Sequence, residues 1–319
     1  MRDSIRMTTI ATTAGPVALS ELGRTLGHEH LIGTSDGMRA QWPHLFDPAA
    51  DVEESIEEVR RAQAHGVETI CDPTCIDIGR DVRVNIAVTA ATGMRFVMAT
   101  GVYGIGFTFL SAFPAHQAVL ADLFVHDIEV GIQSTDVRAG FIKVACDKPG
   151  MTPGIELAHR AAAAASLRTG APIMAHSNPA SATGLAQMRV FLEEGVAPEK
   201  VQIAHCGDTD DVDHIEEVLA TGCFIGMDRY GIPHALPTNQ RNATIAELVK
   251  RGHADRMVIG QDSCVRQDGR TKSEKWRTAP NSNMTYIFDE VAPALTRLGV
   301  SPAQFDDMVG RNVHSWLSA

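Results

Sequence analysis

Short apolar segments alternate with amphipathic segments along most of this chain, and this alternation restricts the possible folds more than any other feature. The apolar segments have the length of strands, and they are predicted at residues 25–32, 67–71, 95–100, 139–145, 172–176, 201–205, 223–227 and 257–260. The amphipathic segments are predicted to be helices, at residues 51–64, 81–91, 120–131, 155–168, 183–194, 212–220 and 244–251. Strands that are apolar at nearly every position are buried on both faces, as in a parallel sheet covered by helices. About eight such units in 319 residues predict an α/β fold, a (β/α)8 TIM barrel, rather than an open doubly wound sheet.

No shift of composition and no low-complexity linker divides the chain, so we expect a single domain over residues 1–319. Residues 1–24 are expected to form an N-terminal lead-in with a turn at Gly15-Pro16, and residues 282–319 to form C-terminal helices. A dinucleotide-binding fold is not expected, because no Gly-x-Gly-x-x-Gly sequence follows the first predicted strand.

Charge and composition exclude several classes of partner. The chain has 28 Lys and Arg residues against 39 Asp and Glu residues, a formal net charge of -11. A surface of this charge repels phosphate backbones, so we expect no nucleic-acid partner. No apolar stretch has the length of a signal peptide core or of a membrane span, which predicts a cytoplasmic protein without a membrane partner. The six cysteines are scattered and are expected to be reduced thiols.

The first predicted strand, TLGHEHLI at residues 25–32, contains two histidines two positions apart. Side chains alternate along a strand, so His28 and His30 are expected on one side and Glu29 on the other. Two neighbouring imidazoles can hold one divalent metal ion. A His-x-His pair alone is weak evidence, and its meaning depends on whether later strands supply further ligands.

Later strands do carry such groups. Lys143 lies within one predicted strand, His176 and His205 end two others, and Asp262 follows the last. Catalytic groups of a barrel lie at the carboxyl ends of its strands, so these side chains are expected at one mouth. A lysine ammonium has only donors and cannot bind a metal ion, whereas a lysine carboxylated by CO2 has two oxygens and can bridge two ions.

Each of these residues also has an ordinary structural explanation. A histidine at a strand end is commonly a hydrogen-bonded packing residue, and a buried lysine can extend to solvent or pair with a carboxylate. Asp262 can be a helix cap or a turn residue. Taken singly these explanations are favoured, but six suitable groups at the ends of five predicted strands favour a metal centre.

The sequence resembles the phosphotriesterase family of the amidohydrolase superfamily, and within it the phosphotriesterase-like lactonases. The resemblance extends over residues 8 to 315 or so, and its stretches are TLGHEH at 25–30, GVY at 101–103, GFIK at 140–143, Gly154, AHCGDTD at 204–210 and IGMDRYG at 225–231. It implies a binuclear site bridged by N-carboxylated Lys143 and a hydroxide. His28, His30 and Asp262 would hold one ion, and His176 and His205 the other. The ions would be zinc, or cobalt, manganese or iron.

The resemblance also implies roles around the metals. Tyr103 and Arg229 would line the substrate pocket, Asp262 would accept the proton of the nucleophile, and Asp208 would relay protons toward bulk water. The alternatives are an aromatic residue packed at the barrel rim for Tyr103, a salt-bridged arginine for Arg229 and a helix cap for Asp208.

The expected function is a metal-dependent hydrolase that opens lactones, with N-acyl-homoserine lactones and hence quorum quenching as the first candidate, and with weak phosphotriesterase activity. The family resemblance implies a homodimer. One alternative is an arylesterase or organophosphate hydrolase, and another is a phosphorylated-sugar lactonase, which would need a cation such as Lys148, Arg266 or Arg270 at the mouth. A more distant alternative is a non-catalytic metal-binding barrel, although such a protein would have no need of the bridging lysine.

Three features depart from the family pattern. Gln261 precedes Asp262, where the family usually has His or Asn. The loops at residues 104–114 and 265–280 are atypical, and both are expected to flank the pocket. Phe107, Phe109 and Phe113 of the first loop, together with Met227, are candidates for contact with an apolar acyl chain.

Overall fold

Eight parallel strands, each hydrogen-bonded to the next along the chain, form the centre of the molecule. In the computed structural model, which describes residues 9–35, 37–104, 116–148, 150–233, 235–270, 274 and 277–319, all seven pairings are parallel. The strands follow one another in the order β3 (Arg24–Leu26), β5 (Val67–Asp72), β6 (Arg95–Val102), β7 (Ala139–Ala145), β8 (Ile173–His176), β9 (Val201–Ala204), β10 (Phe224–Met227) and β11 (Met257–Ile259). This order confirms the predicted TIM barrel.

The barrel closes where β11 meets β3. A Cβ atom on Gly27, directly after β3, would lie 2.6 Å from Val258 Cγ1 on β11, so only glycine allows this approach. Beyond the two strands, the amide of Asp262 donates to the carbonyl of His28 at 3.1 Å. A parallel pair of short strands, β4 (Glu29–Gly33) and β12 (Ser263–Gln267), then continues above the seam. The first and last units of the barrel therefore meet at its carboxyl-terminal mouth.

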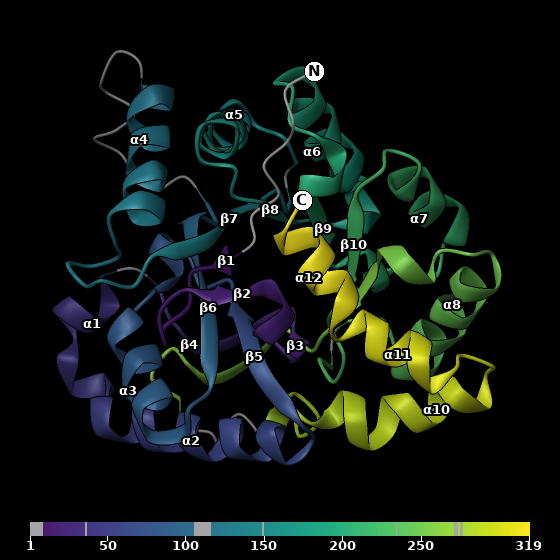
Figure 1. Cartoon of the computed structure of the whole chain (residues 1–319), viewed down its shortest axis with the longest axis horizontal. Coiled ribbons are helices and arrows are strands. Elements are labelled where there is room, and N and C mark those ends of the chain that lie inside the picture. Colours follow the sequence, from purple (N-terminus) through teal and green to yellow (C-terminus); the bar gives the residue numbers. More distant parts are fainter. Residues whose placement is uncertain are drawn as a thin grey trace.

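Helices follow one another around the strands (Figure 1). They are α1 (Met38–Gln41), α2 (Pro48–Ala64), α3 (Val82–Thr92), α4 (His116–Glu129), α5 (Pro153–Thr169), α6 (Thr183–Glu193), α7 (Val212–Leu219), α8 (Thr238–Lys250), α10 (Ala292–Arg297), α11 (Pro302–Met308) and α12 (Arg311–Leu317). The apolar faces of most of these helices join the outer faces of the strands in the larger hydrophobic core. Several helices begin at side-chain caps, as α2 does at Asp47, whose carboxylate accepts from two backbone amides.

A second, smaller core fills the barrel and is closed from below. Phe141 and Met174 point inward from their strands, and Trp316 and Leu317 of α12 pack against this interior cluster. The rings of Phe141 and Trp316 meet edge to face with centroids 5.3 Å apart. In the lead-in, β1 (Thr9–Ile10) pairs with β2 (Val17–Ala18) in a hairpin that contains the expected turn, and Ile10 joins the same cluster. In the described part of the barrel, the carboxyl-terminal mouth is therefore the end that is left for polar chemistry.

The His-x-His stretch is not the continuous strand that the sequence predicted. β3 ends at Leu26 and β4 begins at Glu29, so His28 lies at the break between two strands that pair with different partners. The strand is interrupted because the chain must leave the barrel wall at the seam, where β4 pairs with β12. The strand β12 itself was not predicted, since its sequence SCVRQ lies in a polar stretch that was interpreted as a loop.

Four helices, α2, α4, α5 and α8, begin earlier than the sequence predicted. α2 starts at Pro48 and not at residue 51, because Pro48 occupies the first helical turn after the cap Asp47. α8 starts at Thr238, six residues before the predicted boundary. Most of the predicted loop at 104–114, including all three of its phenylalanines, lies outside the described residues.

No helix in the described ranges combines the length and the apolar character needed to cross a membrane. The six cysteines are free thiols; five are buried, and Cys264 is partly exposed.

Candidate active site

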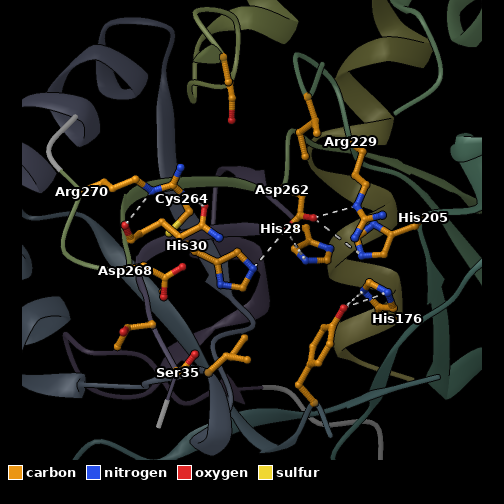
Figure 2. A pocket seen from close by; sticks show the side chains of 18 of the residues that line it. His28, His30, Ser35, His176, His205, Arg229, Asp262, Cys264, Asp268 and Arg270 are labelled. Carbon is orange, nitrogen blue, oxygen red and sulfur yellow. Dashed lines mark hydrogen bonds and ion pairs between the residues drawn. The ribbon is translucent and has the colours of Figure 1, made fainter. Parts of the chain in front are cut away.

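His28, His30 and Asp262 form a group that could hold one divalent cation. One ligand atom from each residue lies within 4.8 Å of the other two. Asp262 Oδ1 is 3.3 Å from His28 Nε2 and 3.2 Å from His30 Nε2, and Figure 2 shows the carboxylate close to both rings. The three residues come from both sides of the barrel seam, so barrel closure assembles this group.

His205, His176 and Lys143 extend the group on the other side of His28. The ring centroids of His28 and His205 are 5.0 Å apart, and those of His205 and His176 are 4.4 Å apart. Lys143 Nζ lies 3.4 Å from His28 Nε2. All six residues named as ligands from the sequence line one pocket of about 630 Å³. The structure therefore brings the whole predicted ligand set together.

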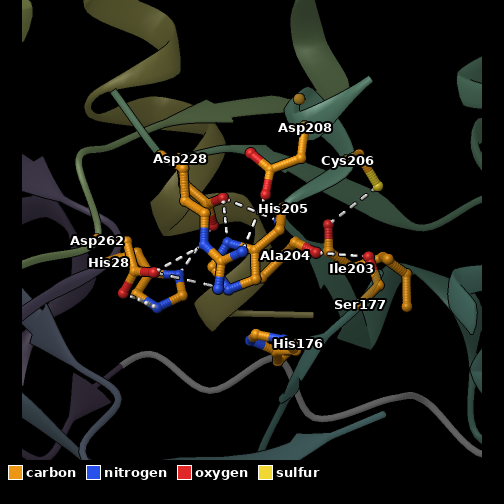
Figure 3. Close-up of polar contacts among 12 residues, drawn as sticks. His28, His176, Ser177, Ile203, Ala204, His205, Cys206, Asp208, Asp228 and Asp262 are labelled. Atoms are coloured by element: carbon orange, nitrogen blue, oxygen red, sulfur yellow. Dashed lines mark hydrogen bonds and ion pairs between the residues drawn. The ribbon is translucent and has the colours of Figure 1, made fainter. Parts of the chain in front are cut away.

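Asp228, at the end of β10, connects two of these histidines from behind (Figure 3). Its Oδ2 is 2.8 Å from His28 Nδ1, and its Oδ1 is 2.9 Å from His205 Nδ1. Burial alone would raise the pKa of Asp228, but the imidazoles of His205 and His28 hold it well below its usual range. A carboxylate only accepts, so both Nδ1 atoms carry the hydrogen, and in the neutral ring each Nε2 has a lone pair for a metal ion.

His30 is oriented in the same way by a different chain of groups. Its Nδ1 is 2.7 Å from the hydroxyl of Thr74, which donates to Asp72 Oδ1 at 2.5 Å. Because the hydroxyl hydrogen is used on Asp72, Thr74 accepts from His30 Nδ1, and His30 Nε2 is left with its lone pair. The Nε2 atoms of His28, His205 and His30 are thus oriented so that each can bind a divalent cation.

Burial adjusts the proton affinity of this cluster. It lowers the pKa of His176 to about 4 and that of His205 well below its ordinary value, so both rings are neutral at pH 7. Burial also lowers the pKa of Lys143 to about 8, although Asp262 and Asp228 act in the opposite direction. The lowered pKa increases the fraction of neutral amine. For His28 the same two carboxylates outweigh burial and raise the pKa. That part of the site therefore attracts positive charge.

Tyr103 lies beside the second pair of histidines. Its hydroxyl is 3.1 Å from His176 Nε2, and it lines the pocket. The carboxylate of Asp77 accepts from the amides of Tyr103 at 2.7 Å and Gly104 at 2.5 Å, which fixes the chain as it leaves β6. Tyr103 is therefore a pocket residue as well as a rim residue.

Arg229 lies between two carboxylates. Its Nε donates to Asp262 Oδ2 at 3.0 Å and its Nη1 to Asp208 Oδ2 at 2.9 Å, while Arg241 donates to Asp208 Oδ1 at 2.7 Å. Arg229 also lines the pocket, so it is at once a salt-bridged and a pocket residue. Asp208 is not the cap of α7, because Asp211 takes that position by accepting from the amide of His214.

The structure also shows where the other candidate pocket residues lie. Met227 is fully buried in the larger core between the strands and the helices, because β10 turns its side chain away from the mouth. Arg266 is buried against Asp51 and Glu54, whereas Arg270 lines the pocket. Asp228 was missed as a functional residue, although its position directly after a barrel strand was a signal that could have found it.

The fold and this donor set together define a class of protein: a TIM-barrel hydrolase that depends on bound metal ions. Residues 8–317 match the model of the Phosphotriesterase family, and the chain belongs to that family. Members of the family are binuclear metal-dependent hydrolases that act on small-molecule esters or lactones.

Three relatives illustrate the range of the family. An aryldialkylphosphatase of Saccharolobus solfataricus is 44% identical over 286 residues, which are 88% of this chain and 90% of that protein. A phospho-furanose lactonase of Mycoplasmopsis synoviae is 26% identical over 94% of this chain and 89% of its own. The solved structure of the phosphotriesterase from Mycobacterium tuberculosis superposes with a TM-score of 0.91 at 37% identity, covering 97% of this chain and 98% of that one.

Proposed function

We propose that this enzyme opens lactones, with N-acyl-homoserine lactones as the first substrates to test, and that it hydrolyses phosphotriesters more weakly. The observation that carries the proposal is the placement of Tyr103 and Arg229 in the same pocket as the six potential ligands. A phenol and a guanidinium beside a metal site suit a carbonyl substrate, which offers oxygen acceptors to both. The relatives named aryldialkylphosphatase and phospho-furanose lactonase support both kinds of ester.

The proposal assigns His28, His30 and Asp262 to one ion, and His176 and His205 to a second. Lys143 would be carboxylated on Nζ and bridge the two; its lowered pKa supports this, because the neutral amine is the form that combines with CO2. Zinc is the first candidate, followed by cobalt, manganese and iron. When bound, such ions supply Lewis-acid polarisation of the ester oxygen and a water of lowered pKa.

The protein groups orient the substrate and move one proton. The Tyr103 hydroxyl donates to the carbonyl oxygen, while Asp262 accepts the proton released as water adds to the carbonyl carbon. Asp262 returns that proton to the ring oxygen as the carbon–oxygen bond breaks, so lactone and water give one hydroxy acid. Arg229 connects Asp262 with Asp208, and Asp208 carries the proton released by the product's carboxylic acid toward solvent.

A phosphorylated-sugar lactonase is the second candidate. One observation favours it: Arg270 lines the same pocket and offers a cation for a phosphate. Activity on phosphorylated lactones, lost in Arg270→Ala while unphosphorylated lactones are still opened, would make this the better assignment.

The first experiment measures metal content and lactone hydrolysis together, before and after chelation. We expect about two equivalents of transition metal per chain and chelator-sensitive opening of acyl-homoserine lactones. Two equivalents without lactone turnover would move the proposal to phosphotriesters, arylesters or phosphorylated lactones. No metal, even after reconstitution with bicarbonate, would contradict the proposed centre.

The variant Lys143→Ala tests whether the protein is an enzyme or a metal-binding barrel without activity. We expect it to lose at least about 100-fold in turnover together with part of its metal, because removing one ligand weakens the site. Lys250→Ala, which changes an exposed lysine on α8, is the control. Unchanged turnover in Lys143→Ala would contradict the bridging role.

We also propose that the protein is cytoplasmic and that it is a homodimer, the second of which the family resemblance supports. Sedimentation velocity at micromolar concentration measures the assembly directly, and a single species of 34.3 kDa would contradict the dimer.

A further inference from the structure

Glu29 has a buried carboxyl group for which the proposed chemistry has no use. It lies between His28 and His30 in sequence, is fully buried and, among the described residues, is not part of the pocket lining. Its side chain points across the barrel seam. Its Oε1 accepts from the amide of Gln261 at 2.7 Å, and its Oε2 accepts from the amide of Ser263 at 2.8 Å.

These two amides belong to the residues on either side of Asp262. Asp262 itself has a φ of 49°, in the left-handed region that residues with a Cβ rarely adopt. Its own amide donates to the carbonyl of His28 at 3.1 Å. Three consecutive amides of the seam are therefore held by two consecutive residues of the His-x-His stretch, two of them by one side chain.

We propose that Glu29 is a positioning residue that holds Asp262 in its left-handed conformation and so directs its carboxylate at His28 and His30. The inference rests on the proposed assignment of these three residues to one metal ion. A carboxyl group suits this task because its two oxygens accept from two amides that converge on it. Burial removes competing water, so the hydrogen bonds are strong enough to maintain the strained residue between them.

The variant Glu29→Gln tests this with little change of shape. An amide side chain keeps one acceptor oxygen and puts an N–H group where the second stood, so one of the two backbone amides loses its partner. Glu58→Gln is the matched control. Glu58 is also buried and accepts a backbone amide, that of Met284 at 2.8 Å, but it lies on α2 away from the ligands.

The first readout is amide hydrogen exchange of the metal-free chain. In the wild type we expect the amides of Gln261 and Ser263 to exchange as slowly as those of β11, and in Glu29→Gln we expect at least one of them to lose that protection. If the amides of Gln261 and Ser263 exchange in the wild type as fast as those of an exposed loop, the proposal is overturned. This measurement uses the wild type alone, so it does not depend on whether a variant folds. If the wild type binds no metal, the proposed function is contradicted. Hydrogen exchange still tests whether Glu29 holds the two backbone amides in that case.

The second readout is Co²⁺ binding, followed by chelator competition and by the visible spectrum of the bound ion. We expect Glu29→Gln to bind at least one Co²⁺ about 10-fold more weakly, with an altered spectrum, as is usual when a group that orients a metal ligand is removed. Glu58→Gln should leave both unchanged. In the Asp262→Ala background Glu29→Gln should have no further effect, because Glu29 acts through Asp262. The proposal would be overturned if Glu29→Gln left the Co²⁺ affinity and spectrum unchanged. It would also be overturned if Glu29→Gln had the same effect in the wild-type and Asp262→Ala backgrounds.

Discussion

Side chains of one residue type have different properties in this structure because their surroundings differ. Lys143 is enclosed by the barrel and has a pKa near 8, whereas Lys250 is an exposed residue of α8. Sequence reasoning found Lys143 because a cation in an apolar strand is conspicuous. It did not find the task of Asp228, because the partner that reveals it, His28, is 200 residues away along the chain.

Asp228→Asn should disturb the metal centre without touching a metal ion directly. The amide can accept from one imidazole but not from both, so His28 or His205 would lose its orientation. We expect metal affinity to fall about 10- to 100-fold, measured by chelator competition. Asp127→Asn, which changes a carboxylate paired with Arg80 outside the site, should leave metal affinity intact. Equal affinities in Asp228→Asn and the wild type would show that the two rings need no such support.

His159 should make stability depend on pH. It is fully buried on α5, with Nδ1 2.8 Å from the carbonyl of Ile155, and burial lowers its pKa from 6.5 to about 4. Between these values the unfolded chain binds a proton that the folded chain does not, so stability falls as the pH falls through this window. The loss attributable to His159 is as much as about 3 kcal/mol at pH 4.

Urea unfolding of chelator-treated protein at several pH values checks this expectation. His159→Gln should lose less stability than the wild type between pH 6.5 and pH 4, and His126→Gln, at an exposed position of α4, should behave as the wild type does. Parallel pH profiles for the wild type and His159→Gln would contradict the assignment.

At the scale of elements, regular apolar strands were predicted well and the strands at the seam were not. β7 has the length that its pattern indicates, because both of its neighbours are barrel strands. Among the described strands, β4 and β12 form a separate pair, and residues 29 and 263 are brought together by barrel closure, which no local pattern records. Most helix ends agree with the predictions within a few residues, and α8 is the main exception.

The last helix, α12, should be essential to the stability of the barrel. Trp316 is completely buried under Phe141, and its indole N–H donates to the carbonyl of Lys200 at 3.1 Å. Trp316→Ala would leave a cavity at the base of the barrel, and we expect a loss of about 3–5 kcal/mol in the free energy of unfolding. Trp42→Ala is the control, because Trp42 is 52% exposed. Similar urea midpoints for the two variants would refute this role of α12.

For the whole molecule, metal binding and folding should be linked. The proposed ligands come from both ends of the strand order, so bound ions would join β3 and β11 across the seam. Metal that binds only the folded chain, at a free concentration 100 times its Kd, adds about 2.7 kcal/mol of stability per site. Thermal unfolding should therefore show a lower Tm after chelation and recovery on adding zinc. Lys143→Ala should recover less, and an unchanged Tm in the chelated wild type would contradict the linkage.

The sequence by itself determined the alternation of buried strands and helices, and hence the barrel. It also determined which imidazoles, which lysine and which carboxylate stand at the ends of those strands. These are local properties: the period of apolar residues and the position of a polar residue within it are visible in a short window.

The tertiary structure alone decided how those groups are held. The break at Gly27 and His28, the left-handed conformation of Asp262, the contact of Asp228 with His28 and those of Glu29 all depend on residues about 200 or more apart along the chain. Such contacts form only when the first and last strands meet, because closing the barrel places the two ends of the strand order side by side. The sequences of the strands thus specify the types of ligand, and the closure of the sheet sets the orientation of those ligands.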